Sequence, residues 1–541
     1  MGLIEDMAKA QEPTTEQEPT KDGMTRRRFL RNAAVVAAGG LGTIYLAGCG
    51  GTTTTTAGGG GSTTSVTSAS SDDEKWKQLA GKKLIFITEN TPPSSAFKTL
   101  LPDFTAKSGI EVDMIQDDDP VVLEKVLIDY RGESKQYQVM YDQDKLMGGT
   151  LADFYLPLDK FFTDDTLPQA KEGYGDDSWL PNLLTVCGRF FTKDKVVGLP
   201  YDTAIATFFY RKDIFEKYSA GFEAEYGYPM VYNSPDANWK NILDWTTYLK
   251  KAKDATDPFG MGLHAGNFAW TVQLDMQRLT YSHGQWLEFP DIDDTLGGKK
   301  PKVTGWGDEQ SIKSLQLFLD IFNQGSPDAL ALGTLELSDA MKAGKVGFCT
   351  QYQEFIATTE DPKTSTVAGK MAYDIVPKGA KEFLVDQSKK LVNGSNNGIG
   401  GISINGQLDE DMQRAAWIFV QWVTSPEVQK KAMVTAGANP TRLAVFEDPE
   451  LQGSAGTPYP AGSATGRTGG TKYPNTMAYP STLPSLSAPN IVFGPKIPNS
   501  QEYYTMMAAE TLSMCAGKQT AAEAAAKLKT NTEAFLAKLP G

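Results

Sequence analysis

Short apolar runs alternate with segments of helical spacing from about residue 81 onward. The runs GKKLIFITEN (81–90), IEVDMI (110–115) and YQVMYD (137–142) are typical of buried strands. Between them, AFKTLLPDFTAKSG (96–109) and PVVLEKVLIDYRG (120–132) space their apolar residues three and four apart and end in glycine, which predicts helices. Strands that alternate with helices predict a mostly parallel sheet covered on both faces.

The same alternation continues through the rest of the chain. The stretch VVGLPYDTAIATFFYRKDIFEKY (196–218) predicts further strands followed by a helix. Amphipathic helices are predicted within 238–255, 308–325, 408–433 and 521–539. By contrast, Gly453–Pro498 is rich in Gly, Pro, Ser and Thr, and predicts a long irregular surface segment. Its composition fits both a cover over a binding cleft and an idle loop.

The N-terminal region has the pattern of an export signal. Arg26 and Arg27 precede a short apolar run, Ala33–Ala47, which contains three glycines and is too short to span a membrane. These residues resemble the twin-arginine signal of bacteria. The ending LAGC, with Cys49 last, resembles a lipoprotein cleavage box, which implies cleavage after residue 48 and lipidation of Cys49. The alternative is an N-terminal membrane helix with a buried cysteine.

A tether is predicted directly after this signal. Residues 50–71 are almost wholly Gly, Thr, Ser and Ala, a composition that buries too little apolar surface to fold. We therefore divide the N-terminal part into a signal peptide, 1–48, and a lipidated tether, 49–74. Localisation is expected to be outside the cytoplasmic membrane, with the protein held there by its lipid anchor alone.

Composition narrows the function further. The chain of 541 residues has 52 Lys and Arg against 66 Asp and Glu, a net charge of −14, which argues against nucleic acid as a partner. Only two histidines occur, and Cys187, Cys349 and Cys515 show no metal-binding spacing. We expect neither a metal site nor a cofactor, and we expect buried unpaired thiols, although the sequence allows one disulfide.

Enzyme motifs are missing from the sequence. No nucleophile elbow, Walker loop, G-x-G-x-x-G or H-E-x-x-H pattern occurs. The run Asp117-Asp118-Asp119 predicts an exposed turn before Pro120 rather than a cation site. A glycosidase that uses two carboxylates stays open, because 66 acidic residues contain many such pairs.

Several local patterns together resemble one family. FTAKSGIEVDMI, TLADFYLPLDKFF, SDAMKAGKVGFCTQY and AAWIFVQWVTSPEVQKKAM, with 196–218 as the most specific, resemble the extracellular solute-binding proteins of ABC importers, in particular the sugar-binding, maltodextrin-binding-protein-like family. The resemblance covers about residues 82 to 540.

The resemblance implies a two-lobe α/β fold of the periplasmic-binding-protein type. Each lobe has a mostly parallel sheet flanked by helices, hinge strands join the lobes, and the cleft closes on ligand. The expected N-terminal lobe is 75–203 plus 405–452, and the expected C-terminal lobe is 204–404 plus 453–541.

The family pattern also indicates where ligand contacts fall, because open α/β sheets bind ligands beyond the carboxyl ends of their strands. The first lobe would contribute residues at three strand ends, namely Asn90, Tyr141, Asp142, Asp144, Tyr201 and Asp202. The second lobe would contribute aromatic and amide side chains, namely Asn267, Phe268, Trp270, Tyr352, Asn393, Ser395 and Asn396. Aromatic faces with carboxylates and amides suit a polyhydroxylated ligand.

These features predict a non-catalytic binding lipoprotein that delivers a carbohydrate to the membrane permease of an ABC importer. The expected partners are the small ligand and the permease subunits, and we expect a monomer. A polyamine or other small cationic solute is the alternative within the binding class, because acidic and aromatic residues also cage amines. A surface glycoside hydrolase and a purely structural lipoprotein are the alternatives from other classes.

Overall fold

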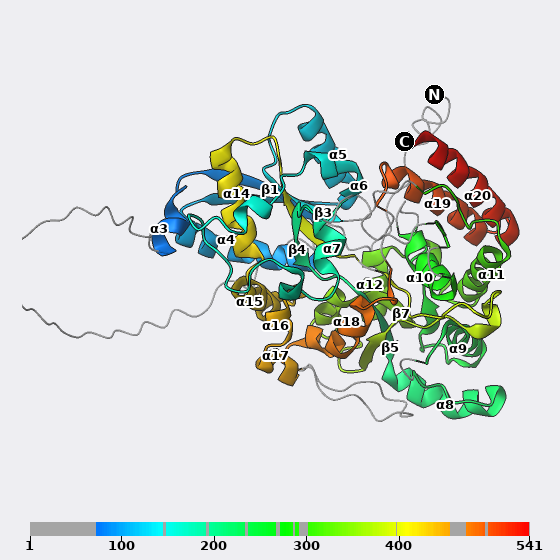
Figure 1. Cartoon of the computed structure of the whole chain (residues 1–541). Helices are drawn as coiled ribbons and strands as arrows, with labels where there is room; N and C mark the ends of the chain where they lie inside the picture. The colour runs from blue at the N-terminus through cyan, green and yellow to red at the C-terminus, as the bar shows by residue number, and fades with distance from the viewer. Residues whose placement is uncertain are drawn as a thin grey trace, which may run out of the picture. The chain divides into compact units, whose positions relative to one another are not determined.

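The computed structural model describes residues 72–143, 148–190, 194–232, 236–266, 271–284, 287–291, 301–396, 398–454, 472–492 and 496–539 (Figure 1). Ala69–Gly541 forms one compact unit. Within the described ranges, no helix combines the length and the apolar character needed to cross a membrane.

A first sheet of five strands contains the predicted alternation of strands and helices. Its order is β2 (Glu111–Asp117), β1 (Lys83–Glu89), β3 (Val139–Gln143), β10 (Gly400–Ile404) and β4 (Gly198–Asp202). Strand β1 pairs in parallel with β2 and β3, whereas β10 runs antiparallel to both β3 and β4. Strand β4 therefore runs in the same direction as β1 and β3. The carboxyl ends of these three strands consequently lie at one edge of the sheet.

Helices of this region begin and end where the sequence supplies caps. Their bounds are α3 (Asp72–Lys77), α4 (Pro92–Ser108), α5 (Asp119–Arg131), α6 (Gly149–Leu151), α7 (Leu183–Gly188), α14 (Glu410–Val423), α15 (Pro426–Ala436), α16 (Leu443–Phe446) and α17 (Pro449–Ser454). Before α4, the Thr91 hydroxyl accepts the Ser94 N–H, and Pro92 fills the first turn. The same helix ends at Gly109, whose φ of 69° is left-handed and favours glycine.

A second sheet of four strands follows the first along the chain. Its order is β6 (Phe259–Gly262), β7 (Val346–Tyr352), β5 (Ala206–Arg211) and β8 (Met371–Ile375). Strands β6 and β7 are parallel, and β5 is antiparallel to β7 and β8. Helices of this region are α8 (Lys212–Tyr226), α9 (Trp239–Ala252), α10 (Val272–Gly284), α11 (Glu309–Gln324), α12 (Thr334–Lys342) and α13 (Ile356–Thr359).

Three residues connect the two sheets. Strand β4 ends at Asp202 and β5 begins at Ala206, which lies opposite Tyr352 at the end of β7. The end of β7 is thereby brought beside the carboxyl edge of the first sheet. The chain returns to the first sheet at β10, which pairs with β3 and β4, whereas the division expected from sequence placed Gly400–Ile404 in the C-terminal lobe.

The C-terminal part contains ordered elements where irregular chain was predicted. Helix α18 (Tyr479–Leu486) buries most of its side chains, and β11 (Ile491–Val492) pairs with β9 (Ser395–Asn396). The prediction of an irregular surface segment over Gly453–Pro498 is therefore wrong for its described second half. Helices α19 (Ser500–Cys515) and α20 (Ala521–Lys538) lie against α10 and α11 (Figure 1).

Two tryptophans of the helix predicted within 408–433, and three cysteines, lie in the core. The Trp417 side chain on α14 is fully buried and stacks on Phe161 with ring centroids 5.2 Å apart. Trp422, on the same helix, packs against Phe104. The three cysteines, Cys187, Cys349 and Cys515, are buried thiols, as expected.

Candidate functional site

Four carboxyl side chains converge where the two sheets meet. Glu89 ends β1, Asp119 begins α5, Asp202 ends β4, and Glu354 lies in the short helix η6 (Gln353–Phe355) after β7. Asp119, Asp202 and Glu354 are 2%, 1% and 5% exposed, and Glu89 is half-buried. We call these four residues the carboxyl cluster.

The carboxyl cluster strongly disfavours its own ionisation. Burial raises the pKa of Glu89 to about 7, although contacts with Asp119 and Tyr141 oppose this rise. Burial also raises the pKa of Asp119 and of Asp202 well above the usual range, and the charge of Glu89 adds to both shifts. The pKa of Glu354 rises for the same reasons, through burial and then through the charges of Asp202 and Glu89.

Four acceptor oxygens of the carboxyl cluster have no hydrogen-bond donor among the described residues. They are Oδ2 of Asp202, Oε2 of Glu354 and both oxygens of Asp119, whose carboxyl group also interacts with that of Glu89. The other oxygen of Asp202, Oδ1, accepts the Gly400 N–H at 3.4 Å, which fixes the orientation of the carboxyl group. Buried polar atoms in folded proteins are nearly always paired, so the unpartnered oxygens of Asp202 and Glu354 are suited to donors of a ligand.

Three tyrosines surround the carboxyl cluster. The charges of Asp202, Glu89, Asp119 and Glu354 all act on the Tyr141 hydroxyl, which places it at the centre of the group. Burial raises the pKa of the Tyr352 hydroxyl, and the charges of Glu354 and Glu89 add to this rise. Tyr201 lies edge-on to Tyr141 at 5.9 Å and packs tightly on Phe97 at 4.8 Å, so its ring belongs to the core beneath the site.

A glycine-rich segment holds two of these rings. A Cβ atom at Gly398 would lie 3.0 Å from Cε1 of Tyr352, and one at Gly400 would overlap the Tyr141 ring itself. Both rings therefore lie directly against backbone of the segment that leads into β10. The glycines are needed here for close approach rather than for unusual backbone angles.

We expect Gly400→Ala to weaken ligand binding by at least about tenfold, because the added methyl group displaces Tyr141 from the carboxyl cluster. Affinity is measured by titration calorimetry with the polyol or sugar that stabilises the wild type most. Gly401→Ala is the matched control, since its Cβ would meet the Cys187 carbonyl oxygen instead of Tyr141. Both variants should lose stability, and equal loss of affinity in both would contradict a positioning role for Gly400.

A buried ion-pair network supports Tyr352 from the second sheet. Arg278 on α10 donates from one terminal nitrogen to Oδ1 of Asp275 at 2.7 Å and to the Thr350 hydroxyl at 2.8 Å. The guanidinium carbon lies 5.3 Å from the Tyr352 ring centroid. His264 donates its backbone N–H to Oδ2 of Asp275 at 2.8 Å. Although burial opposes it, the charges of His264 and Arg278 hold the pKa of Asp275 well below its usual range.

Several residues predicted from sequence are used elsewhere in the structure. Asp142 lies on the opposite face of β3 from Tyr141, beside Tyr155 and Tyr130. Asn393 donates its side-chain amide to the Val376 carbonyl at 2.8 Å, and the Ser395 hydroxyl donates to the Ala206 carbonyl at 2.9 Å. These contacts give Asn393 and Ser395 structural roles.

The structure does not bring the remaining predicted residues into the carboxyl cluster. Asn90 is exposed at the end of β1, and its backbone N–H donates to the Asp117 carbonyl. Asn396 pairs with Val492 through the β9 backbone. The other predicted positions lie outside the described residues, or side chains, namely Asp144, Asn267, Phe268, Trp270, Cys49, Arg26, Arg27 and the Asn396 side chain.

Sequence reasoning missed three members of the carboxyl cluster. Glu89 directly precedes the predicted Asn90, and Glu354 follows the predicted Tyr352 by two positions, so strand ends did carry a signal. Asp119 was assigned to an exposed turn, but it is buried in the first turn of α5. Only the sheet order shows that these positions meet.

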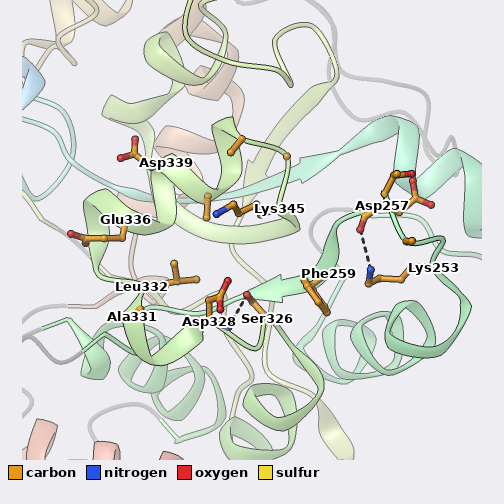
Figure 2. A pocket seen from close by; sticks show the side chains of 15 residues that line it. Lys253, Asp257, Phe259, Ser326, Asp328, Ala331, Leu332, Glu336, Asp339 and Lys345 are labelled. Atoms are coloured by element: carbon orange, nitrogen blue, oxygen red, sulfur yellow. Dashed lines mark hydrogen bonds between the residues drawn. The ribbon is translucent and has the colours of Figure 1, made fainter. Parts of the chain in front are cut away.

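A separate cavity of about 730 Å³ lies at the edge of the second sheet (Figure 2). It is bounded by Phe259 at the start of β6, by Glu336 and Asp339 on α12, and by Lys345. Figure 2 also shows Lys253 bonded to Asp257 on one side. None of its lining residues belongs to the carboxyl cluster or to the predicted site. Both acidic and basic side chains line this cavity. The unpartnered oxygens of the carboxyl cluster do not belong to its lining.

Comparison with known proteins identifies the class. Residues 99–458 match the bacterial extracellular solute-binding proteins, and the chain belongs to this family. A probable amino-acid ABC transporter periplasmic-binding protein of Sinorhizobium fredii is 20% identical over 471 residues, which are 85% of this chain and 90% of that protein. The class that the family match shows for this chain is therefore an extracellular solute-binding protein.

Solved structures agree in fold. An ABC transporter solute-binding protein of Agrobacterium radiobacter K84, in complex with ribitol, has a TM-score of 0.65 and 19% identity, covering 84% of this chain and 99% of that one. The maltose-bound MalE3 of T. maritima has a TM-score of 0.64 and 16% identity, covering 84% and 100%. The expected α/β periplasmic-binding-protein fold is confirmed.

Proposed function

We propose that this protein captures a sugar or polyol and delivers it to the permease of an ABC importer. The observation that carries the proposal is the carboxyl cluster, with the unpartnered oxygens of Asp202 and Glu354 near Tyr141 and Tyr352. Hydroxyl groups can donate to those oxygens, and carbon-bound hydrogens of a sugar pack on aromatic faces. The ligands of the two similar structures, ribitol and maltose, are polyhydroxylated compounds of this kind.

Capture would involve both sheets. The carboxyl cluster takes Glu89, Asp119 and Asp202 from the first sheet, and Glu354 from the segment after β7 of the second. The short connection between Asp202 and Ala206 is where we propose a hinge between two lobes. A ligand that bridges Asp202 and Glu354 would stabilise the closed arrangement, which the permease subunits would recognise.

Anchoring is part of the same proposal. Arg26 and Arg27 would direct export, and lipidated Cys49 would hold the protein at the outer face of the cytoplasmic membrane through the 49–74 tether. A binding protein held near its permease meets the transporter at high effective concentration.

A thermal-shift screen of the full-length protein tests the function. The panel contains ribitol, D-glucitol, D-glucose, maltose, L-amino acids and spermidine. A ligand that binds only the folded state adds about 2.7 kcal/mol of stability at 100 times its dissociation constant. A shift with a sugar or polyol, recovered intact by chromatography, is the expected result. Shifts confined to amino acids or to spermidine would overturn the proposal, and a cleaved maltose would indicate a hydrolase.

We expect Tyr352→Ala to weaken binding of the selected sugar more than tenfold, because the ring packs beside Arg278 and is close enough to Glu354 and Glu89 for their charges to act on it. Tyr373→Ala is the matched control: this tyrosine is equally buried on β8 of the same sheet, where its hydroxyl bonds Glu360. Affinity is measured on both variants at a temperature where circular dichroism shows them folded. Unchanged affinity in Tyr352→Ala would remove this ring from the site.

A further inference from the structure

The carboxyl cluster gathers more acidic groups than a neutral sugar requires. Four acidic side chains from four separate segments influence one another, and three of them are at least nine-tenths buried. Among the described residues, the charged groups that act on these four carboxyls are all acidic, with Asp118 as the additional neighbour. The protein thus supplies the cluster with no described counter-charge.

The basic side chain beside Tyr352 is already neutralised. Arg278 is paired with Asp275 at 2.7 Å in a fully buried bridge, and it acts on Tyr352 but not on the four carboxyls. The positive charge of Arg278 is therefore balanced within its own buried ion pair.

A metal ion does not fit the cluster, and a neutral hydroxyl group meets only part of what it offers. No group of three acidic, histidine or cysteine side chains in the described residues has the geometry to hold a metal ion. A hydroxyl group can satisfy the unpartnered oxygens of Asp202 and Glu354, but it does not stabilise the ionised forms of these carboxyls. A protonated amine does both, because it donates three hydrogen bonds and its positive charge favours the ionised carboxylates.

The surrounding rings favour the same group. Tyr141 lies among all four carboxyls, and Tyr352 lies beside Glu354 and Glu89. Electron-rich ring faces attract an ammonium group, most strongly where water is excluded.

We propose that the transported solute is an aminated sugar or polyol, whose ammonium group is held between Asp202, Glu354 and Glu89 while its hydroxyls occupy the rest of the site. This inference rests on the proposed sugar or polyol function and narrows it to a chemical class. Burial raises the pKa values of these carboxyls in the unliganded protein, and the ammonium group lowers them by stabilising the ionised forms. Binding at neutral pH therefore releases protons to the solvent.

Titration calorimetry of the full-length protein at pH 7 tests the inference with matched ligand pairs. The pairs are 1-amino-1-deoxy-D-glucitol against D-glucitol, and D-glucosamine against D-glucose and N-acetyl-D-glucosamine. Repeating each titration in phosphate and in Tris buffer gives the number of protons released. At least one amine should bind about tenfold or more tightly than its neutral partner, the preference expected of a charge-assisted hydrogen bond, and should release protons.

Two isosteric variants separate charge from shape. Asp202→Asn and Glu354→Gln should each reduce the preference for the amine over its neutral partner to below about threefold, because an amide keeps the shape of the side chain but cannot carry the negative charge. Glu427→Gln removes a charge from an exposed position of α15 and should change nothing. Two variants are used so that poor folding of one leaves the other as the test.

The outcomes distinguish the two proposals. Equal or tighter binding of the neutral ligands overturns the proposed specificity for an amine, while the proposed sugar or polyol function stands. Binding of spermidine or lysine without binding of any hydroxylated ligand overturns the sugar function itself. Displacement of the amine by millimolar calcium chloride, with calcium binding on its own, would mean that the cluster is an inorganic cation site and would overturn the inference.

Discussion

The unliganded protein is expected to lose stability as the pH rises from 5 to 8, in contrast to most proteins with many surface carboxylates. Glu89 has an ordinary pKa of 4.5, and burial raises this pKa to about 7 in the folded chain. Between those values the folded state binds more protons than the unfolded state, so the free energy of unfolding falls as the pH rises. The stabilisation is complete below about pH 4.5 and is lost as the pH passes about 7.

The expected change in the free energy of unfolding is large for a single side chain. A shift from 4.5 to about 7 corresponds to about 3 kcal/mol, and partial exposure of Glu89 reduces this to about 2 kcal/mol. The raised pKa values of Asp119, Asp202 and Glu354 act in the same direction. His283 acts in the opposite direction, because burial lowers its pKa and penalises its protonation below about pH 6.5.

Urea unfolding at pH 5, 6.5 and 8 measures this effect for the wild type and for Glu89→Gln. The variant should be the more stable protein at pH 8, and the difference between the two should shrink toward pH 5. Taking that difference cancels the contribution of His283, which both proteins share. Glu427→Gln should follow the wild type at every pH. A difference that does not change with pH would contradict the raised pKa of Glu89.

Local chain chemistry explains why much of the fold could be predicted. Periodicity and caps act between neighbours in sequence, so Gly109 marked the end of α4 and the strand–helix alternation marked the parallel part of the first sheet. The same cues failed for α18, whose composition is rich in Pro and Ser, because burial against the rest of the fold stabilises it. Tertiary packing outweighs local propensity in such a segment.

The site was predictable only in part, for a physical reason. Asp202 and Tyr141 stand at strand ends, and Tyr352 closes a fully buried apolar strand, so each carries a local signal. The charge of the site depends instead on the meeting of four segments that lie up to 265 positions apart between Glu89 and Glu354. Like-charged residues are dispersed throughout this acidic sequence, and only the strand order shows which of them converge.

Arg278→Met is expected to cost about 3 to 5 kcal/mol of stability, which is the usual price of stranding one partner of a fully buried ion pair. Asp275 would keep its contacts to His264 and Thr350 but lose the positive charge at 2.7 Å. Urea unfolding at pH 7 gives the loss directly. Since Arg278 also lies over Tyr352, ligand affinity should fall in the same variant.

The double variant Arg278→Met, Asp275→Asn separates these two effects. Asparagine can accept the His264 backbone N–H through its carbonyl oxygen and donate to the Thr350 hydroxyl through its amide, while it carries no charge to strand. We therefore expect the double variant to regain about half of the lost stability or more, a coupling of about 1 to 3 kcal/mol. Affinity should stay low, because the Tyr352 ring still lacks its guanidinium support. If the double variant is no more stable than Arg278→Met, the loss comes from packing against Tyr352 rather than from the stranded carboxylate, and the network is a mechanical support of the site rather than an electrostatic one.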